Sequence, residues 1–136
     1  MATFHFQKEK MDELGIAGIF LFGSRAQGTA GKMSDYDFAV ILKDQKTLFG
    51  AKRKKEIYDY LYDFLSGQIK ELSNIDIVFA QEADLQFRHH VAKDGVMVYQ
   101  GDQKTLSRFL EDTLDSYADF APMRREFQKA ILARIS

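Results

Sequence analysis

Two short apolar segments, joined by a polar loop, constrain the fold of this 136-residue chain more than any other feature. Residues 16–22 and 36–42 are rich in Ile, Phe, Leu and Val, so strands buried on both faces fit them better than helices. The loop between them begins with a Gly-Ser pair and ends at two aspartates separated by one residue. We therefore expect a β-loop-β unit whose loop and strand ends carry the polar chemistry.

The rest of the chain alternates helical and extended patterns. Residues 4–14 can form a short helix that Gly15 ends, and helical sequence resumes over residues 82–93. Between them, apolar residues spaced three and four apart predict a helix over residues 47–72, with Gly67 as a candidate break. Extended segments are expected over residues 75–80 and 96–100. From residue 102 onward the pattern is helical, interrupted at Pro122. The predicted fold class is α/β, with strands early in the chain and a helical C-terminal end.

Composition limits the classes of protein that fit. A chain of 136 residues with 46% hydrophobic and 29% charged residues is expected to form one globular domain over residues 1–136. A net charge of −1 argues against an extended nucleic-acid interface. Because there is no cysteine, carboxylates and histidines are the plausible metal ligands. The chain lacks a long apolar run and a signal-like start, so we expect no membrane span and a cytoplasmic location.

The acidic end of the loop has the chemistry of a metal site. Asp35 and Asp37 should project from one face of a strand, where two carboxylates repel each other unless a cation lies between them. Magnesium commonly binds one or two protein carboxylates together with substrate phosphates and water. Asp76, near the start of the third predicted strand, adds a third carboxylate if that strand lies beside the second. Three carboxylates can hold two magnesium ions for an in-line phosphoryl displacement.

The glycine-rich end of the loop has the chemistry of a phosphate site. Gly23 and Gly28 allow the backbone to approach an anion closely, and Ser24 offers a hydroxyl. Neither a P-loop nor a G-x-G-x-x-G dinucleotide motif is present. Loop and carboxylates together therefore predict a nucleotide site.

Each of these features also has an ordinary structural explanation when taken alone. The two aspartates could mark an exposed strand start, Ser24 and Arg25 a turn, and residues 52–55 a solvated basic helix face. His89 and His90 are adjacent, so on a helix they diverge and cannot bind one ion together. The apolar stripes of the C-terminal helices fit either the core of the domain or a partner surface. The joint spacing of Gly23, Ser24 and the three aspartates favours the nucleotide site.

These residues resemble a known family. Gly23-Ser24, ten residues, then Asp35-x-Asp37 matches the signature of the polymerase-β-like nucleotidyltransferases, with Asp76 as the third carboxylate. The small size, residues 96–102 and residues 117–132 resemble the minimal nucleotidyltransferases (MNT) that act as antitoxins beside HEPN-domain ribonuclease toxins. The resemblance implies a polymerase-β-like fold, a small mixed sheet flanked by helices with a helical C-terminal tail.

The resemblance also implies roles for individual residues. Gly23 and Ser24 would bind the triphosphate of ATP with Arg25 beside them, and the three aspartates would bind two magnesium ions, with Asp76 also helping to activate the attacking hydroxyl. Many relatives carry Arg before the second glycine, where this chain has Gln27. Arg25 and Lys32 are the candidates to replace that charge.

The function implied by the resemblance is transfer of AMP from ATP to a tyrosine hydroxyl of a cognate HEPN toxin, which silences the toxin. Residues 102–135 are the candidate partner-binding helices. Two alternatives stay open. One is a non-catalytic antitoxin that only covers the toxin, and the other is adenylylation of a small molecule such as an aminoglycoside.

Overall fold

The computed structural model describes residues 4–23, 35–69 and 74–117. Along the chain these residues form the following elements: α1 (Lys8–Glu13), β1 (Ile16–Phe22), β2 (Tyr36–Leu42), the 3-10 helix η1 (Gln45–Phe49), α3 (Ala51–Gln68), β3 (Ile75–Phe79), the 3-10 helix η2 (Ala80–Glu82), α4 (Leu85–Asp94), β4 (Val96–Gln100) and α5 (Gln103–Tyr117). The described helices include none that is long and apolar enough to cross a membrane.

The strands form one mixed sheet in the order β3-β2-β1-β4. β1 pairs antiparallel with both β2 and β4, whereas β2 and β3 run parallel. The first two strands occupy the predicted ranges, and they pair with each other as the predicted β-loop-β unit requires. The α/β class and the mixed sheet flanked by helices are confirmed.

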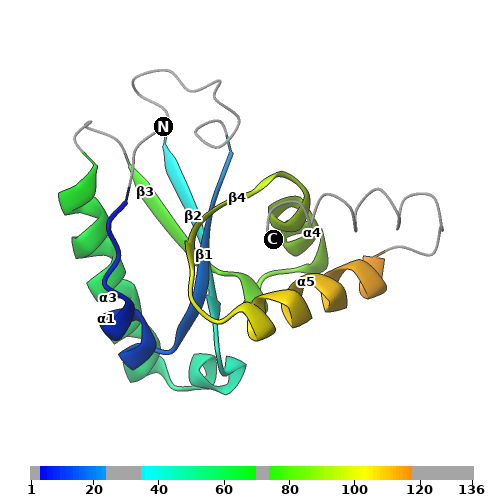
Figure 1. Cartoon of the computed structure of the whole chain (residues 1–136), viewed down its shortest axis with the longest axis horizontal. Coiled ribbons are helices and arrows are strands. Elements are labelled where there is room, and N and C mark those ends of the chain that lie inside the picture. Colours follow the sequence, from blue (N-terminus) through cyan, green and yellow to red (C-terminus); the bar gives the residue numbers. More distant parts are fainter. Residues whose placement is uncertain (1–3, 24–34, 70–73, 118–136) are drawn as a thin grey trace.

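Helices cover both faces of the sheet (Figure 1), with α1 and α3 on one side and α4 and α5 on the other. Even-numbered residues of β2 pack toward α1 and α3, and odd-numbered residues face α4 and α5, as the alternation along a strand requires. Every residue of β1 is buried. The central strands are therefore apolar on both faces, which explains why their sequences show no polar alternation.

The first helix is shorter than predicted, because Phe4 and Phe6 join the core through an extended segment instead of a helix. The Phe4 ring meets Phe38 edge-on with centroids 5.5 Å apart. The Phe6 ring stacks on Phe64 at 5.1 Å. The apolar spacing at the start of the chain thus reflects aromatic packing, and the helix begins only at Lys8.

The second predicted helix begins as two elements. Asp44 caps η1 by accepting a hydrogen bond from the Lys46 backbone N–H, and the extended Gly50 separates η1 from α3. Gly67 does not break α3, which ends one residue later at Gln68. The third predicted helix is likewise preceded by η2, and Asp84 caps α4 by accepting from the Phe87 N–H.

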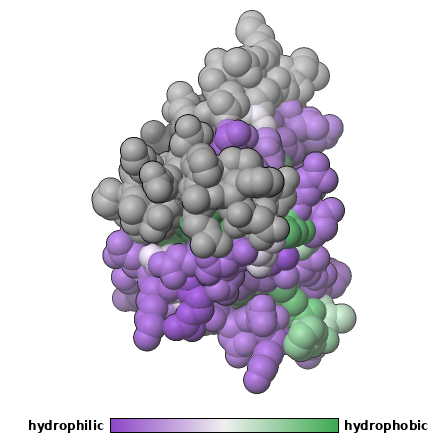
Figure 2. Space-filling model, turned by 90° about the vertical axis from the view of Figure 1, so that its right-hand side faces the viewer, coloured by the Kyte–Doolittle hydropathy of each residue, from purple (hydrophilic) through white to green (hydrophobic). Residues whose placement is uncertain are grey.

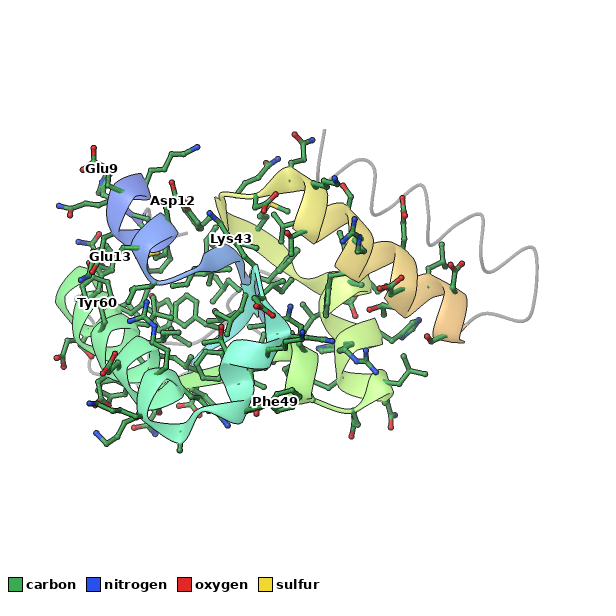
Figure 3. All side chains as sticks on the ribbon, turned by 90° about the horizontal axis from the view of Figure 1, so that it is seen from below. Glu9, Asp12, Glu13, Lys43, Phe49 and Tyr60 are labelled. Carbon is green, nitrogen blue, oxygen red and sulfur yellow. The ribbon has the colours of Figure 1, made fainter. Side chains whose placement is uncertain are left out.

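Polar contacts fasten the end of the sheet where β2 leaves it. The Gln81 side chain accepts a hydrogen bond from the Leu42 N–H at 2.8 Å and donates one to the Leu42 carbonyl at 2.7 Å. It thus makes the pair of backbone hydrogen bonds that a residue of a neighbouring strand would make. Figure 3, seen from this end, shows Lys43 beside Asp12 of α1, at an Nζ to Oδ1 distance of 3.2 Å. The opposite end of the sheet, where β1 ends and β2 begins, carries the candidate site.

Candidate active site

Three residues on neighbouring strands form a row at this end of the sheet. The antiparallel register places Phe22 of β1 opposite Asp37 of β2, and the parallel register places Asp37 beside Asp76 of β3. Residues paired in this way share a face of the sheet, and Phe22 belongs to the core between the sheet and helices α4 and α5. The row therefore runs Asp76, Asp37, Phe22 across that face, and the pairing of β3 beside β2 meets the condition under which the sequence brings Asp76 next to Asp37.

Asp37 lies in the most perturbed environment of the three acidic residues. Partial burial raises the pKa of its carboxyl above the ordinary value, and the charges of Asp76 and Asp35 raise this pKa further. Asp35 and Asp76 are both exposed. The site thus concentrates negative charge around one partly desolvated carboxylate, which a cation would stabilise.

Gly23 follows directly after β1, and its backbone lies close to the Asp37 side chain. Its φ of +81° lies in the left-handed region that favours glycine, and an added Cβ would lie only 2.8 Å from the Asp37 Oδ2 atom. The backbone conformation therefore favours glycine, and a side chain at this position would require the Asp37 carboxylate to move. The carboxylate and the first residue of the loop are therefore in direct proximity, as the prediction of one joint site requires.

The donor chemistry of this end fits a hard divalent cation. Carboxylate oxygens are the ligands that magnesium prefers, and Asp37 and Asp76 stand side by side in register. Over the described ranges, no three His, Asp or Glu side chains converge into a ready ligand cluster. A bound ion would accordingly take two carboxylates from adjacent strands and complete its shell with substrate oxygens and water.

One boundary of the site was not predicted from the sequence. The Phe22 ring is met edge-on by Phe87 of α4, with centroids 5.1 Å apart, and by the imidazole of His90, at 6.1 Å. The His90 Nδ1 atom lies 3.2 Å from the Asp94 Oδ2 atom one turn later. The residues Phe22, Phe87 and His90 are called the α4 wall below. The spacing of positions 87, 90 and 94 indicates one helix face, but nothing in the sequence says which strand end it meets.

The other candidate features have structural partners or lie outside the described residues. Within the basic run, Arg53 pairs with Glu56, Lys54 with Glu82 and Lys55 with Asp59, which supports a solvated helix face. The His90 Nδ1 atom faces Asp94, one turn along the same helix. The following residues of interest lie outside the described ranges: Ser24, Arg25, Gln27, Gly28, Lys32, Pro122, Phe127, Ile131 and Ile135.

The apolar stripe of α5 belongs to the core of the molecule. Its buried members, which pack against the sheet and α4, are Leu106, Phe109, Leu110 and Leu114. On the side that bears α4 and α5, the described surface is mostly hydrophilic, with a small apolar patch at its lower edge (Figure 2). In the described part of α5, therefore, this stripe is not a partner surface.

Comparison with known proteins bears on the identity of this site. Residues 6–104 match the family described as "Polymerase beta, Nucleotidyltransferase". The curated protein adenylyltransferase MntA of Aphanizomenon flos-aquae (strain 2012/KM1/D3) is 27% identical over 109 residues, which cover 79% of this chain and 72% of that protein.

Solved structures show the same fold. A chain of a toxin-antitoxin crystallised with AMP-PNP has a TM-score of 0.56 and 23% identity, covering 96% of this chain and 100% of that chain. A chain from the complex of the tri-AMPylated Shewanella oneidensis HEPN toxin with its MNT antitoxin has a TM-score of 0.51 and 21% identity, covering 95% and 96%. The four-stranded mixed sheet and its flanking helices are thus shared with these proteins.

Proposed function

This chain belongs to the polymerase β nucleotidyltransferase family, and from that premise we propose that it is a magnesium-dependent antitoxin that transfers AMP from ATP to a tyrosine hydroxyl of a HEPN-domain toxin. The observation that carries the proposal is the register of Asp37 with Asp76, beside a glycine in contact range of the Asp37 carboxylate. The acceptor is chosen because the MntA relative is a protein adenylyltransferase and because a chain of similar fold comes from a complex with an AMPylated HEPN toxin.

The proposed reaction is an in-line displacement at the α-phosphorus of ATP. The tyrosine oxygen bonds to this phosphorus, the bond to the bridging oxygen of the β-phosphate breaks, and pyrophosphate leaves. Asp76, exposed at the end of the row, accepts the tyrosine proton. Asp35 and Asp37 bind cations together with Asp76, and Gly23, Ser24 and Arg25 hold the triphosphate. Magnesium, when bound, neutralises the triphosphate and lowers the pKa of the attacking hydroxyl.

The proposal assigns the whole chain to one minimal nucleotidyltransferase domain acting in the cytoplasm, where an antitoxin meets its toxin and ATP. Residues 102–135 are proposed to contact the toxin. Because the apolar stripe of α5 is buried, its contribution would come from the outward, polar side, which includes the exposed residues Lys104, Arg108, Glu111 and Asp112. A toxin contact of this kind is compatible with catalysis, since the row of aspartates lies at the end of the sheet.

The test is transfer of label from α-labelled ATP to a purified cognate HEPN-domain toxin. With magnesium, the wild-type chain should label the toxin, and Asp35→Ala/Asp37→Ala should abolish both the label and the neutralisation of the toxin. Asp59→Ala is the matched control, because this exposed aspartate on α3 pairs with Lys55 far from the row. An unlabelled toxin that the double variant still neutralises would show a non-catalytic, binding antitoxin. Label on an aminoglycoside but not on the toxin would show the small-molecule alternative.

A further inference from the structure

With its triphosphate at the row of aspartates, ATP can extend its nucleoside in only a few directions. The opposite face of the sheet is filled by α1 and α3, whose buried residues include Met11, Ile57 and Leu61. On the other face, against which α4 and α5 pack, Asp76 is the exposed end of the row, and the proposed acceptor enters there. Phe22 is buried beneath α4, so a nucleoside that extends the other way along the row is directed toward the exposed side chains of α4.

The α4 wall stands at that end of the row. Adjacent strands lie about 4.8 Å apart and the Phe22 and His90 rings are 6.1 Å apart, so the two steps from Asp37 to Phe22 and on to His90 together span at most roughly 11 Å. This span is comparable to the length of a ribose and a base. Phe22 itself is buried, whereas 49% of the His90 side chain is exposed. His90 is thus the accessible part of the α4 wall.

We propose that His90 is a specificity residue that contacts the nucleobase of the bound nucleotide, through its ring and its Nε2 atom. The inference rests on the proposed nucleotidyl transfer and adds the residue that distinguishes a nucleotide from a bare triphosphate. The contact of Nδ1 with a carboxylate makes Nδ1 the donor and fixes the ring. Nε2 is then the acceptor that can bond the polar edge of a base, and the half-exposed imidazole can stack on a planar ligand.

The test compares two ligands that share the phosphates and differ in the base. Binding of ATP and of inorganic tripolyphosphate, each with magnesium, is measured by titration calorimetry. His90→Ala should weaken ATP binding about 5- to 100-fold, the range that loss of a stacking side chain gives, and should leave tripolyphosphate binding unchanged. His90→Phe, which keeps a planar ring, should bind ATP within about threefold of the wild type. His89→Ala is the matched control, because the neighbouring side chain points about 100° around the helix.

Two results would overturn the inference while the proposed function stands. The first is wild-type ATP affinity in His90→Ala. The second is an equal loss of both ligands in a variant that still melts at the wild-type temperature, because that result indicates a phosphate contact. A wild-type chain that binds neither ligand would instead refute the nucleotidyltransferase function, and the inference with it.

Discussion

Asp37 is the residue at which the electrostatics of the candidate site can be measured. Its pKa is raised by burial and by the charges of Asp76 and Asp35. A carboxyl whose folded pKa exceeds its unfolded value favours folding most below the unfolded pKa, and this contribution is lost as the pH rises through the folded pKa. Asp37→Asn should therefore raise the melting temperature of the metal-free chain at pH 7 by about 2–5 °C. The gain should vanish below about pH 4, where the wild-type carboxyl is protonated.

Thermal denaturation at both pH values, with and without magnesium, checks this prediction. Magnesium should raise the melting temperature of the wild type and have little effect on Asp37→Asn, which has lost a ligand. The same variant should transfer no AMP. A lower melting temperature for Asp37→Asn in metal-free buffer at pH 7 would show that the carboxylates do not repel as the register implies.

Gly23 connects backbone conformation to the same carboxylate. Gly23→Ala places a Cβ at a φ of +81° and 2.8 Å from Asp37 Oδ2, so the carboxylate must move. We expect a loss of about 1–2 kcal/mol in the free energy of unfolding and a fall in AMP transfer of about 10- to 100-fold.

Gly67→Ala is the matched control, because Gly67 lies in α3 with no heavy atom within 4 Å of the added Cβ. It should stabilise the chain by about 0.5–1 kcal/mol. Denaturant titration and the label assay measure both effects, and wild-type transfer by Gly23→Ala would contradict the close approach.

At the scale of elements, α5 packs so closely on β1 that adding one methyl group between them should lower the stability of the chain. A Cβ added at Gly18 would lie 2.5 Å from a Leu106 methyl carbon, so Gly18→Ala should destabilise the chain by about 1–3 kcal/mol. Leu106→Ala alone should lose about 2–5 kcal/mol through a cavity. The double variant should lose less than the sum of the two, because each change relieves the other. Strictly additive losses in denaturant titration would place α5 farther from β1.

Elements were predictable from the sequence where one local rule decides the outcome. β1 is apolar throughout and bounded by Gly15 and Gly23, and β2 is apolar apart from Asp37 and ends before Lys43, so their ranges were predicted correctly. The start of α1 was not, because residues 4–7 were included in the predicted helix, whereas Phe4 and Phe6, two residues apart, are held extended by Phe38 and Phe64. Only the folded sheet brings those partners together, so no window of sequence contains the information.

The same distinction applies to the candidate site. Asp35 directly precedes β2 and Asp37 lies within it, and the sequence alone predicts that two residues so spaced on an extended segment share one face. The register of Asp37 with Asp76 depends on how β3 pairs, which the sequence left conditional and the parallel ladder supplies. The α4 wall depends on the packing of a helix against the end of β1, so it was visible only in the structure.

At the scale of the whole molecule, the candidate site lies at one end of the sheet and the 3-10 helix η1 lies at the other. β2 runs from the aspartate end to η1, and its seven residues span roughly 20 Å at about 3.3 Å per residue. Phe49 of η1 is 85% exposed and lies apart from the polar contacts of α1 (Figure 3). Its neighbour Leu48 packs against the core. The chemistry of the aspartate end should therefore be independent of Phe49.

Phe49→Ser tests this independence, because an exposed ring contributes little to folding and its removal leaves the core intact. We expect a melting temperature within about 1 °C of the wild type, together with unchanged ATP binding and AMP transfer and less self-association at high concentration. Leu48→Ser, the matched control, should lose about 1–3 kcal/mol of stability because it removes a partly buried apolar side chain. Calorimetry, the label assay and light scattering give the three measurements. If Phe49→Ser bound ATP normally but failed to label the toxin, η1 would have to be part of the surface that holds the acceptor, and the two ends would act together.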